Sequence, residues 1–263
     1  MKKGLFLLLT LIAFSPLSVL AATVPVTSLQ SGDLIRGETL SAVYYYGEDG
    51  LRYVFPNDKT YFTWYKNFNG VKWISDKDLA TIQIGGNVTY KPGVKMLKIN
   101  SDPKVYAVSS GGTLRPIASE AIATALYGND WNKKIDDVPD GFFPNYHVGG
   151  TVEFASQYGV SAEQQDASSI NADKNLKPAK LISIGNTGYE SPTTTIDFGT
   201  AVRFVNNATI NQTATEWDGE WGSGTLKPGQ HFTRYFPENE KGTWTFYSMY
   251  TAKNVMTGAL IVK

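Results

Sequence analysis

Hydrophobic and polar residues divide the chain into four stretches of different character. Residues 4–20 are almost wholly apolar, and residues 22–155 carry short apolar and aromatic runs separated by Gly, Asn and Asp. Residues 156–178 are mostly polar, whereas residues 179–263 return to short alternating runs at even spacing. Short alternating runs between turn residues are typical of β-strands. The pattern therefore predicts a mainly β protein with two folded regions.

Residues 1–21 have the layout of a secretory signal peptide. Two lysines precede the apolar stretch, and Val19 and Ala21 are small residues three and one positions before the expected cut. This arrangement predicts cleavage after Ala21 and export from the cytoplasm. The alternative is an uncleaved anchor, although about 17 apolar residues is at the lower limit for a membrane span. No later apolar run approaches that length, so we expect no membrane span after cleavage.

The region 22–155 contains an internal repeat. Matching segments occur in the same order, at an offset that drifts from 62 to 64 residues. The matches are Val43-Tyr44 with Val105-Tyr106, Leu51-Arg52 with Leu114-Arg115, and Gly85-Gly86 with Gly149-Gly150. Collinear matches of this kind predict two diverged copies of one unit, at about residues 34–90 and 97–154.

Each copy is expected to form a small α+β unit. A turn signal between two strand-like runs predicts a β-hairpin, and a capping residue before a run of helix formers predicts a helix. A last strand is expected after each pair of glycines. The predicted hairpins are 43–46 with 51–55 and 105–108 with 114–117, the helices are 57–65 and 119–127, and the last strands are 88–90 and 152–154.

Aromatic residues are the candidate binding groups. Successive side chains of a strand point to opposite faces, so Tyr44, Tyr45 and Tyr46 are expected to place at least one ring outward. Trp217 and Trp221 lie in an acidic loop that could clasp a sugar. Exposed rings suit sugar faces and partner surfaces. The alternative is that these rings form the core, because small units have few other large residues to bury.

The two copies resemble a repeat of exported bacterial proteins. The resemblance is carried by the Val-Tyr hairpin, the Leu-Arg pair and the ending Phe142-Phe143-Pro144-Asn145-Tyr146 followed by Gly149-Gly150. It implies a cell-envelope or cell-surface setting and no particular activity.

Residues 156–178 are predicted to be a polar linker because Gln, Ser, Ala, Asp and Asn dominate them. Several evenly spaced strands after the linker predict a β-sandwich over residues 179–263. The expected strands are 180–184, 194–198, 201–205, 231–236, 243–247 and 259–262.

The region 179–263 resembles a plastocyanin-like cupredoxin domain. The motifs that carry the resemblance are Gly188-Tyr189, Gly199-Thr200, Pro228-Gly229, Gly242-Thr243-Trp244 and Met256 before Gly258. The resemblance implies a Greek-key sandwich and, in copper-bearing relatives, a mononuclear site for electron transfer.

The copper ligands of that family do not carry over to this chain. At the positions that the resemblance assigns to the two histidines and the cysteine, the sequence has Gln212, Thr251 and Ser248, and only Met256 matches, as the weak axial ligand. Type 1 copper needs one thiolate and two imidazoles. We therefore expect the domain to hold no metal and no other cofactor.

The composition of the chain excludes several classes of partner and of catalytic site. The chain has 24 basic and 24 acidic residues, and this balance argues against a nucleic-acid partner. It has no cysteine, which excludes disulfides, thiolate metal sites and thiol catalysis. Its two histidines, His147 and His231, leave little room for a histidine triad. His231 precedes the inward Phe232 and is expected to face solvent.

These observations together predict a secreted, non-enzymatic protein of a bacterial cell surface, envelope or periplasm. Its partner would be an envelope polymer, a glycan or a surface protein, bound through exposed rings. The alternative is a metal-handling or electron-transfer cupredoxin with a non-standard copper site near Gln212, His231, Met249 and Met256.

Overall fold

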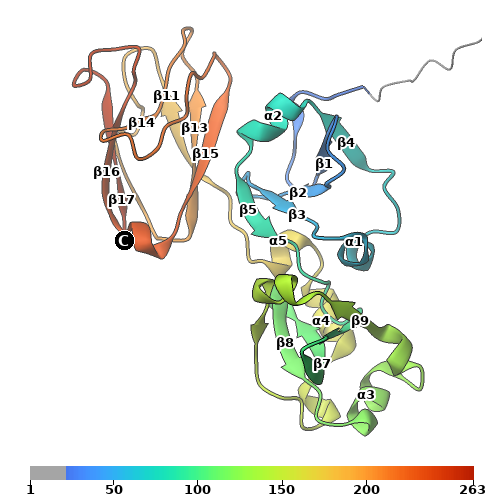
Figure 1. The fold of residues 1–263 in the computed structure, drawn as a ribbon. Helices are drawn as coiled ribbons and strands as arrows, with labels where there is room; N and C mark the ends of the chain where they lie inside the picture. Colours follow the sequence, from blue (N-terminus) through green and yellow to red (C-terminus); the bar gives the residue numbers. More distant parts are fainter. Residues whose placement is uncertain (1–21) are drawn as a thin grey trace, which may run out of the picture.

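The computed structural model describes residues 22–263, and the predicted signal peptide lies outside the described residues. Two mixed five-stranded sheets are followed by two smaller sheets that face each other (Figure 1). Strands and short helices alternate throughout, so the fold is mainly β, as predicted. No helix among residues 22–263 is long and apolar enough to cross a membrane.

The first sheet has the strand order β4-β1-β2-β3-β5. Strands β1, β2 and β3 pair antiparallel, while β4 runs parallel to β1 and β5 runs parallel to β3. Helix α1 covers one face of the sheet and α2 covers the other. The elements are β1 (Leu34–Gly37), β2 (Tyr44–Tyr46), β3 (Arg52–Val54), α1 (Asp58–Trp64), β4 (Val71–Ile74), α2 (Asp76–Thr81) and β5 (Ile84–Asn87).

The second sheet has the order β9-β6-β7-β8-β10, with the same strand directions at corresponding places. Helix α3 covers one face, and the 3₁₀-helix η4 lies on the other. The elements are β6 (Met96–Ile99), β7 (Asp102–Ser109), β8 (Thr113–Pro116), α3 (Glu120–Tyr127), η3 (Trp131–Lys134), β9 (Ile135–Val138), η4 (Asp140–Asn145) and β10 (His147–Val148).

The predicted hairpins and helices are confirmed as β2–β3, β7–β8, α1 and α3. Helix α3 begins after Ser119, whose hydroxyl accepts from the Ile122 backbone N–H, and ends at Gly128, which has a φ of 84°. The predicted last strands at 88–90 and 152–154 are wrong, because β5 contains the glycine pair and β10 precedes it.

The predicted linker 156–178 is largely helical, with α4 (Val160–Asp166) and α5 (Ile170–Asp173). Its few apolar residues are buried against the two sheets: Tyr158 packs on the second and Ile170 on the first. Two such residues, twelve positions apart, are too sparse to produce a recognisable periodicity in the sequence. The connection to the last domain is therefore only the short segment after α5.

The region from residue 180 forms the predicted β-sandwich. One sheet has the order β11-β13-β15 and the other β12-β17-β16-β14. Phe204, Phe236 and Phe246 are fully buried between them. The strands are β11 (Lys180–Ile184), β12 (Thr193–Ile196), β13 (Thr200–Asn206), β14 (Thr215–Glu216), β15 (His231–Phe236), β16 (Gly242–Tyr247) and β17 (Thr257–Val262).

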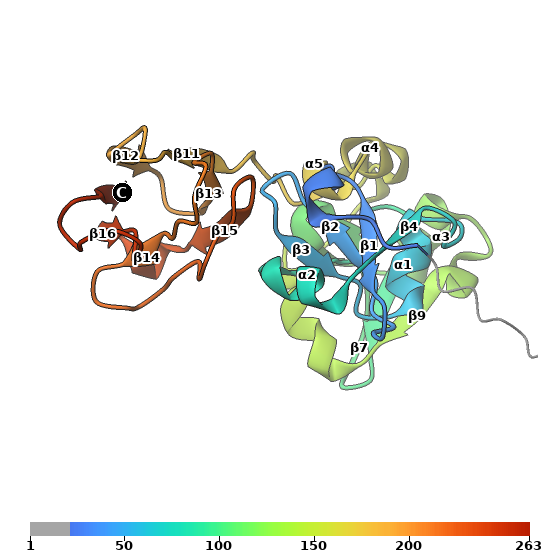
Figure 2. The ribbon, with the colours of Figure 1, turned by 90° about the horizontal axis from the view of Figure 1, so that it is seen from above.

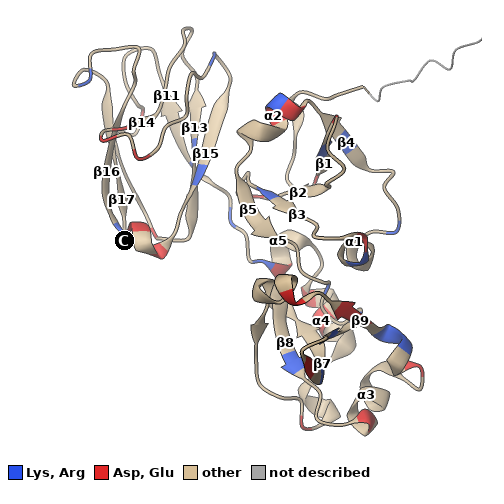
Figure 3. Cartoon of the chain, viewed as in Figure 1, with Lys and Arg blue, Asp and Glu red and all other residues tan. Residues whose placement is uncertain are grey.

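The sandwich stands beside the first sheet rather than on the second (Figures 1 and 2). Arg203 in β13 donates from Nη2 to the Tyr46 hydroxyl at 2.9 Å, and the Tyr235 backbone N–H donates to Gln83 Oε1 at 3.3 Å. Basic and acidic residues are scattered along residues 22–263, and most strands carry few of them (Figure 3), in keeping with the balanced composition.

Candidate functional site

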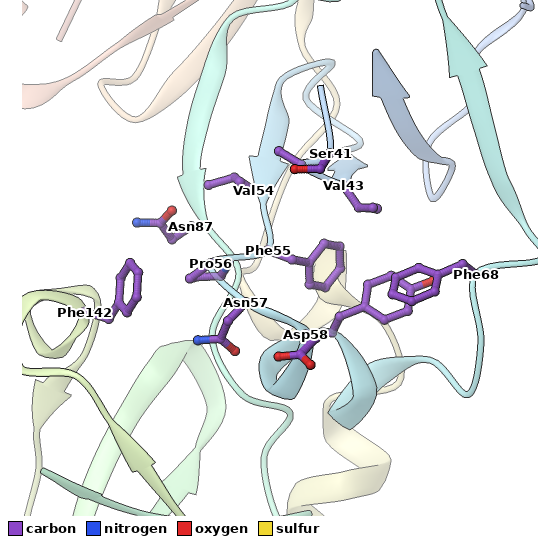
Figure 4. Close-up of a pocket in the computed structure, with 12 residues that line it drawn as sticks. Ser41, Val43, Val54, Phe55, Pro56, Asn57, Asp58, Phe68, Asn87 and Phe142 are labelled. Carbon is purple, nitrogen blue, oxygen red and sulfur yellow. The ribbon is translucent and has the colours of Figure 1, made fainter. Parts of the chain in front are cut away.

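A cavity of about 490 Å³ opens between the β2–β3 hairpin, the start of α1 and η4 (Figure 4). The chain segments that meet there are distant in sequence: Ser41, Phe55, Asn87 and Phe142 all line it. In the view of Figure 4, Phe142 and Asn87 lie on one side and Phe68 on the other, with Phe55 and Pro56 between them.

The rings at this cavity form a fixed stack. The centroids of Tyr61 and Phe68 are 4.4 Å apart with the rings nearly parallel, and Phe55 meets Tyr61 edge-on at 5.0 Å. Tyr61 is buried, and its hydroxyl donates to the Asn67 carbonyl at 2.8 Å, which ties the loop of Phe68 to α1. Phe68 and the adjoining Phe62 are 48% and 49% exposed. The stack thus presents rings to solvent on a rigid base.

Polar groups stand beside the rings. Asn57 Oδ1 accepts from the Thr60 backbone N–H at 2.8 Å, so its NH₂ group is the end that is left to donate elsewhere. Asn87 Nδ2 donates to Asn145 Oδ1 at 2.7 Å, and its own oxygen can still accept. Asp58 adds an exposed carboxylate at the rim. The cavity therefore offers a donor, an acceptor and a negative charge next to aromatic faces.

The predicted aromatic surface is wrong for four of its five residues. Tyr44, Tyr45 and Tyr46 are all buried, because α1 and α2 cover opposite faces of the sheet and leave neither face of β2 open. Trp221 is buried among Phe204, Phe236 and Phe246 in the sandwich core.

Trp217 is the fifth residue, and it is half-buried beside Tyr247 under Lys253 Nζ, 4.4 Å from its ring. The half-exposed ring that lines the cavity, Phe68, and the adjoining Phe62 were not among the candidate residues from the sequence. The sequence feature that could have indicated an exposed ring is Phe68 itself, because it lies inside the polar turn 66–70, where no core position was expected.

The four positions predicted from the copper family come together at one end of the sandwich. The Ser248 hydroxyl donates to Gln212 Oε1 at 2.6 Å, and both side chains are fully buried. The Ser248 backbone N–H donates to the Met256 carbonyl at 3.2 Å, and Thr251 Oγ1 donates to the Ser248 carbonyl at 3.1 Å.

The side chains of this cluster do not fit a type 1 copper site. That site needs a soft thiolate and two imidazoles, whereas this cluster offers a hydroxyl, an amide and a thioether. The Ser248 hydroxyl already donates to Gln212 and also accepts from the Thr213 backbone N–H at 3.2 Å. Within residues 22–263 no group of three or more His, Asp or Glu side chains is placed to hold a metal ion.

His231 does not join this cluster and does not face solvent as predicted. It is half-buried in β15 and lines a cavity of about 280 Å³ together with Thr27 and Asp78, which belong to the part of the chain that contains the first sheet. Burial, and secondarily the charge of Arg203, lowers the pKa of His231 from 6.5 to about 4. The ring is therefore neutral in the folded protein at neutral pH.

No family model and no curated protein matches the sequence. Among solved structures, a purple cupredoxin from Nitrosopumilus maritimus is 20% identical with a TM-score of 0.28, covering 32% of this chain and 99% of its own. The copper-containing nitrite reductase NirK from Thermus scotoductus is 18% identical with a TM-score of 0.30, covering 34% of this chain and 23% of its own. An oxidised mutant of amicyanin is 17% identical with a TM-score of 0.30, covering 34% and 85%. Similarities of this size carry no argument about function.

Proposed function

We propose that this protein is an exported, non-enzymatic binding protein of the cell envelope that holds an N-acetylated glycan in the cavity of the first sheet. Export is the expectation from the signal-peptide layout of residues 1–21. The envelope setting is the expectation from the resemblance of the repeats to exported bacterial proteins.

The observation that carries the proposal is the half-exposed Phe68 ring stacked on buried Tyr61 beside two side-chain amides. An aromatic face packs against the apolar face of a sugar ring, and the sugar edge needs hydrogen-bond partners. The NH₂ group of Asn57 and the free oxygen of Asn87 are suited to the carbonyl and the N–H of an acetamido group.

Charge favours an uncharged sugar unit over a uronic acid or an acidic peptide segment in the cavity. Asp58 is the one charged residue in the lining, and a carboxylate repels another carboxylate close to it while it accepts hydrogen bonds from sugar hydroxyls. A single carboxylate also supports binding rather than cleavage, because glycoside hydrolysis normally uses a pair.

The remaining parts are proposed to be structural. We infer that the two sheets are copies of one unit, because their strand order, strand directions and helix placement are the same. The sandwich would serve as a copper-free support or interaction module, since a hydrogen-bonded Ser248–Gln212 pair stands at the copper-ligand positions.

The test is retention of the protein comprising residues 22–263 on chitin, on purified peptidoglycan, and on alginate as the acidic polymer. We expect retention on the first two only, and at least about tenfold weaker binding in Phe68→Ala, the typical loss for a central aromatic contact. Phe198→Ala is the matched control, because Phe198 is 43% exposed but lies in the sandwich. Absence of retention on chitin and peptidoglycan, or equal retention of both variants, would overturn the proposal.

A further inference from the structure

A second cavity, of about 240 Å³, lies in the second sheet beside α3. It is enclosed by the β7–β8 hairpin, the first turn of α3 and the loop that leads to β9. Trp131 forms one wall, and Glu120 stands at the rim. Helix α3 packs on Met96 and Ala107 of the second sheet, as α1 packs on Leu34 and Tyr45 of the first.

Backbone pairing shows that this cavity is in the equivalent place to the first. The Val43 carbonyl accepts from the Phe55 N–H at 3.1 Å, and the Val105 carbonyl accepts from the Ile117 N–H at 2.9 Å. Each hairpin is then followed at the same distance by a helix N-cap, Asn57 in one and Ser119 in the other. The common offset is 62 residues.

At this offset, seven residues that line the second cavity correspond to residues that line the first, and Trp131 corresponds to Phe68 after one extra residue in α3. Four of these pairs have the same kind of side chain in both cavities: Val43 with Val105, Asn57 with Ser119, Asp58 with Glu120, and Phe68 with Trp131. Each cavity thus has an aliphatic strand residue, a polar cap, a carboxylate and an aromatic ring in the same order.

The two cavities differ in how the ring is supported. The buried Tyr61 beneath Phe68 corresponds to Ala123, and Trp131 is a larger ring that is half-buried. The second cavity is smaller and also carries Lys104, so its lining is balanced in charge. The shared chemistry is one aromatic face with a carboxylate and a polar cap beside it, which suits a neutral polyhydroxylated ligand.

We propose that the second cavity binds a further sugar unit of the same polymeric glycan through its ring, carboxylate and polar cap, so that one chain binds two units of a repeating polymer. This inference rests on the proposed function of the first cavity. Two linked sites for sugar units act together only when the ligand carries several such units, because the second contact then forms at a high effective concentration. A polymeric glycan meets this condition, whereas a single small molecule does not.

The test is a ¹⁵N NMR titration of the protein comprising residues 22–263 with the N-acetylglucosamine tetramer. We expect two sets of resonances to shift: the backbone of residues 55–61, and the indole N–H of Trp131 with the amide of Glu120. Phe68→Ala should lower the affinity reported by the first set of resonances at least about tenfold and leave the affinity reported by the second set unchanged. Glu120→Gln should lower the affinity reported by the second set and leave the first unchanged. Glu120 is exposed, so this variant keeps the fold that Trp131→Ala could disturb.

The outcomes separate the two proposals. If only residues 55–61 respond, the second site is wrong and the proposed function stands. If neither set responds to the tetramer, the proposed function fails and the second site fails with it. If Phe68→Ala abolishes both sets, the cavities are not independent sites and the inference is overturned.

Discussion

Lowering the pH should reduce the contribution that His231 makes to the stability of this protein. Its pKa is lowered from 6.5 to about 4 in the folded state, because the half-buried ring loses hydration and lies near Arg203. Unfolding restores the ordinary pKa, so between these two values the unfolded chain binds more protons than the folded chain. The stabilisation is therefore complete above pH 6.5 and is lost as the pH falls toward 4.

The size of the effect follows from the shift. One pKa unit corresponds to about 1.4 kcal/mol, so the shift from 6.5 to about 4 is equivalent to about 3 kcal/mol when the pH falls below both values. About 2 kcal/mol of this is lost between pH 7 and pH 5. Solvent reaches part of the ring and screens its interactions, so we expect a loss of about 1–2 kcal/mol over that interval.

The assay is urea unfolding followed by circular dichroism at pH 7, 6 and 5. His231→Gln should remove the expected loss, so that its stability relative to the natural chain rises by about 1–2 kcal/mol on going to pH 5. His147→Gln is the matched control for replacing a histidine at an exposed position, and only His231→Gln is expected to remove the loss. Equal pH dependence in the natural chain and in His231→Gln would show that His231 is not the cause of the loss.

Three further outcomes are expected. Ser248→Ala removes the hydroxyl that donates to Gln212 Oε1 in a fully buried pair. Urea unfolding should show that the free energy of unfolding falls by about 1–3 kcal/mol. A fall of less than about 0.5 kcal/mol would contradict the buried hydrogen bond. Ser248→Cys, titrated with copper and followed by visible absorption, should give no intense blue-copper band, because both imidazoles of a type 1 site are missing. A strong band at one copper per chain would contradict the conclusion that these positions do not fit type 1 copper. Gly50→Ala should cost about 1–3 kcal/mol in urea unfolding, because Gly50 has a φ of 79° and a methyl group there would meet the Arg203 guanidinium. The control Gly70→Ala, with no atom within 4 Å of the added carbon, should change stability little, and equal losses in the two variants would exclude this explanation.

Much of the local structure could be predicted from the sequence, because local signals are strong where they occur. The hairpins follow from turn residues between alternating runs, and α3 follows from a serine cap and a closing glycine. Strands β1 and β6 were not among the expected elements; each has only four residues, and its place is fixed by pairing with distant strands.

The cavity of the first sheet could not be predicted, because its walls come from segments as far apart as Ser41 and Phe142. Alternation in Tyr44 to Tyr46 predicts opposite faces correctly, yet it cannot show that a helix covers each face. The meeting of Gln212 and Ser248, 36 residues apart, was expected only through a family resemblance and not from any periodicity.

The central claim is that aromatic cavities on the two sheets bind a glycan, and its most direct test is equilibrium binding to chitin of the natural chain and of Phe68→Ala combined with Glu120→Gln. We expect saturable binding by the natural chain. Binding by the double variant should be about a hundredfold weaker or more, because both sites are impaired, and the two proteins should unfold at the same urea concentration. Binding of equal strength by the two proteins, or no binding by the natural chain, would contradict it.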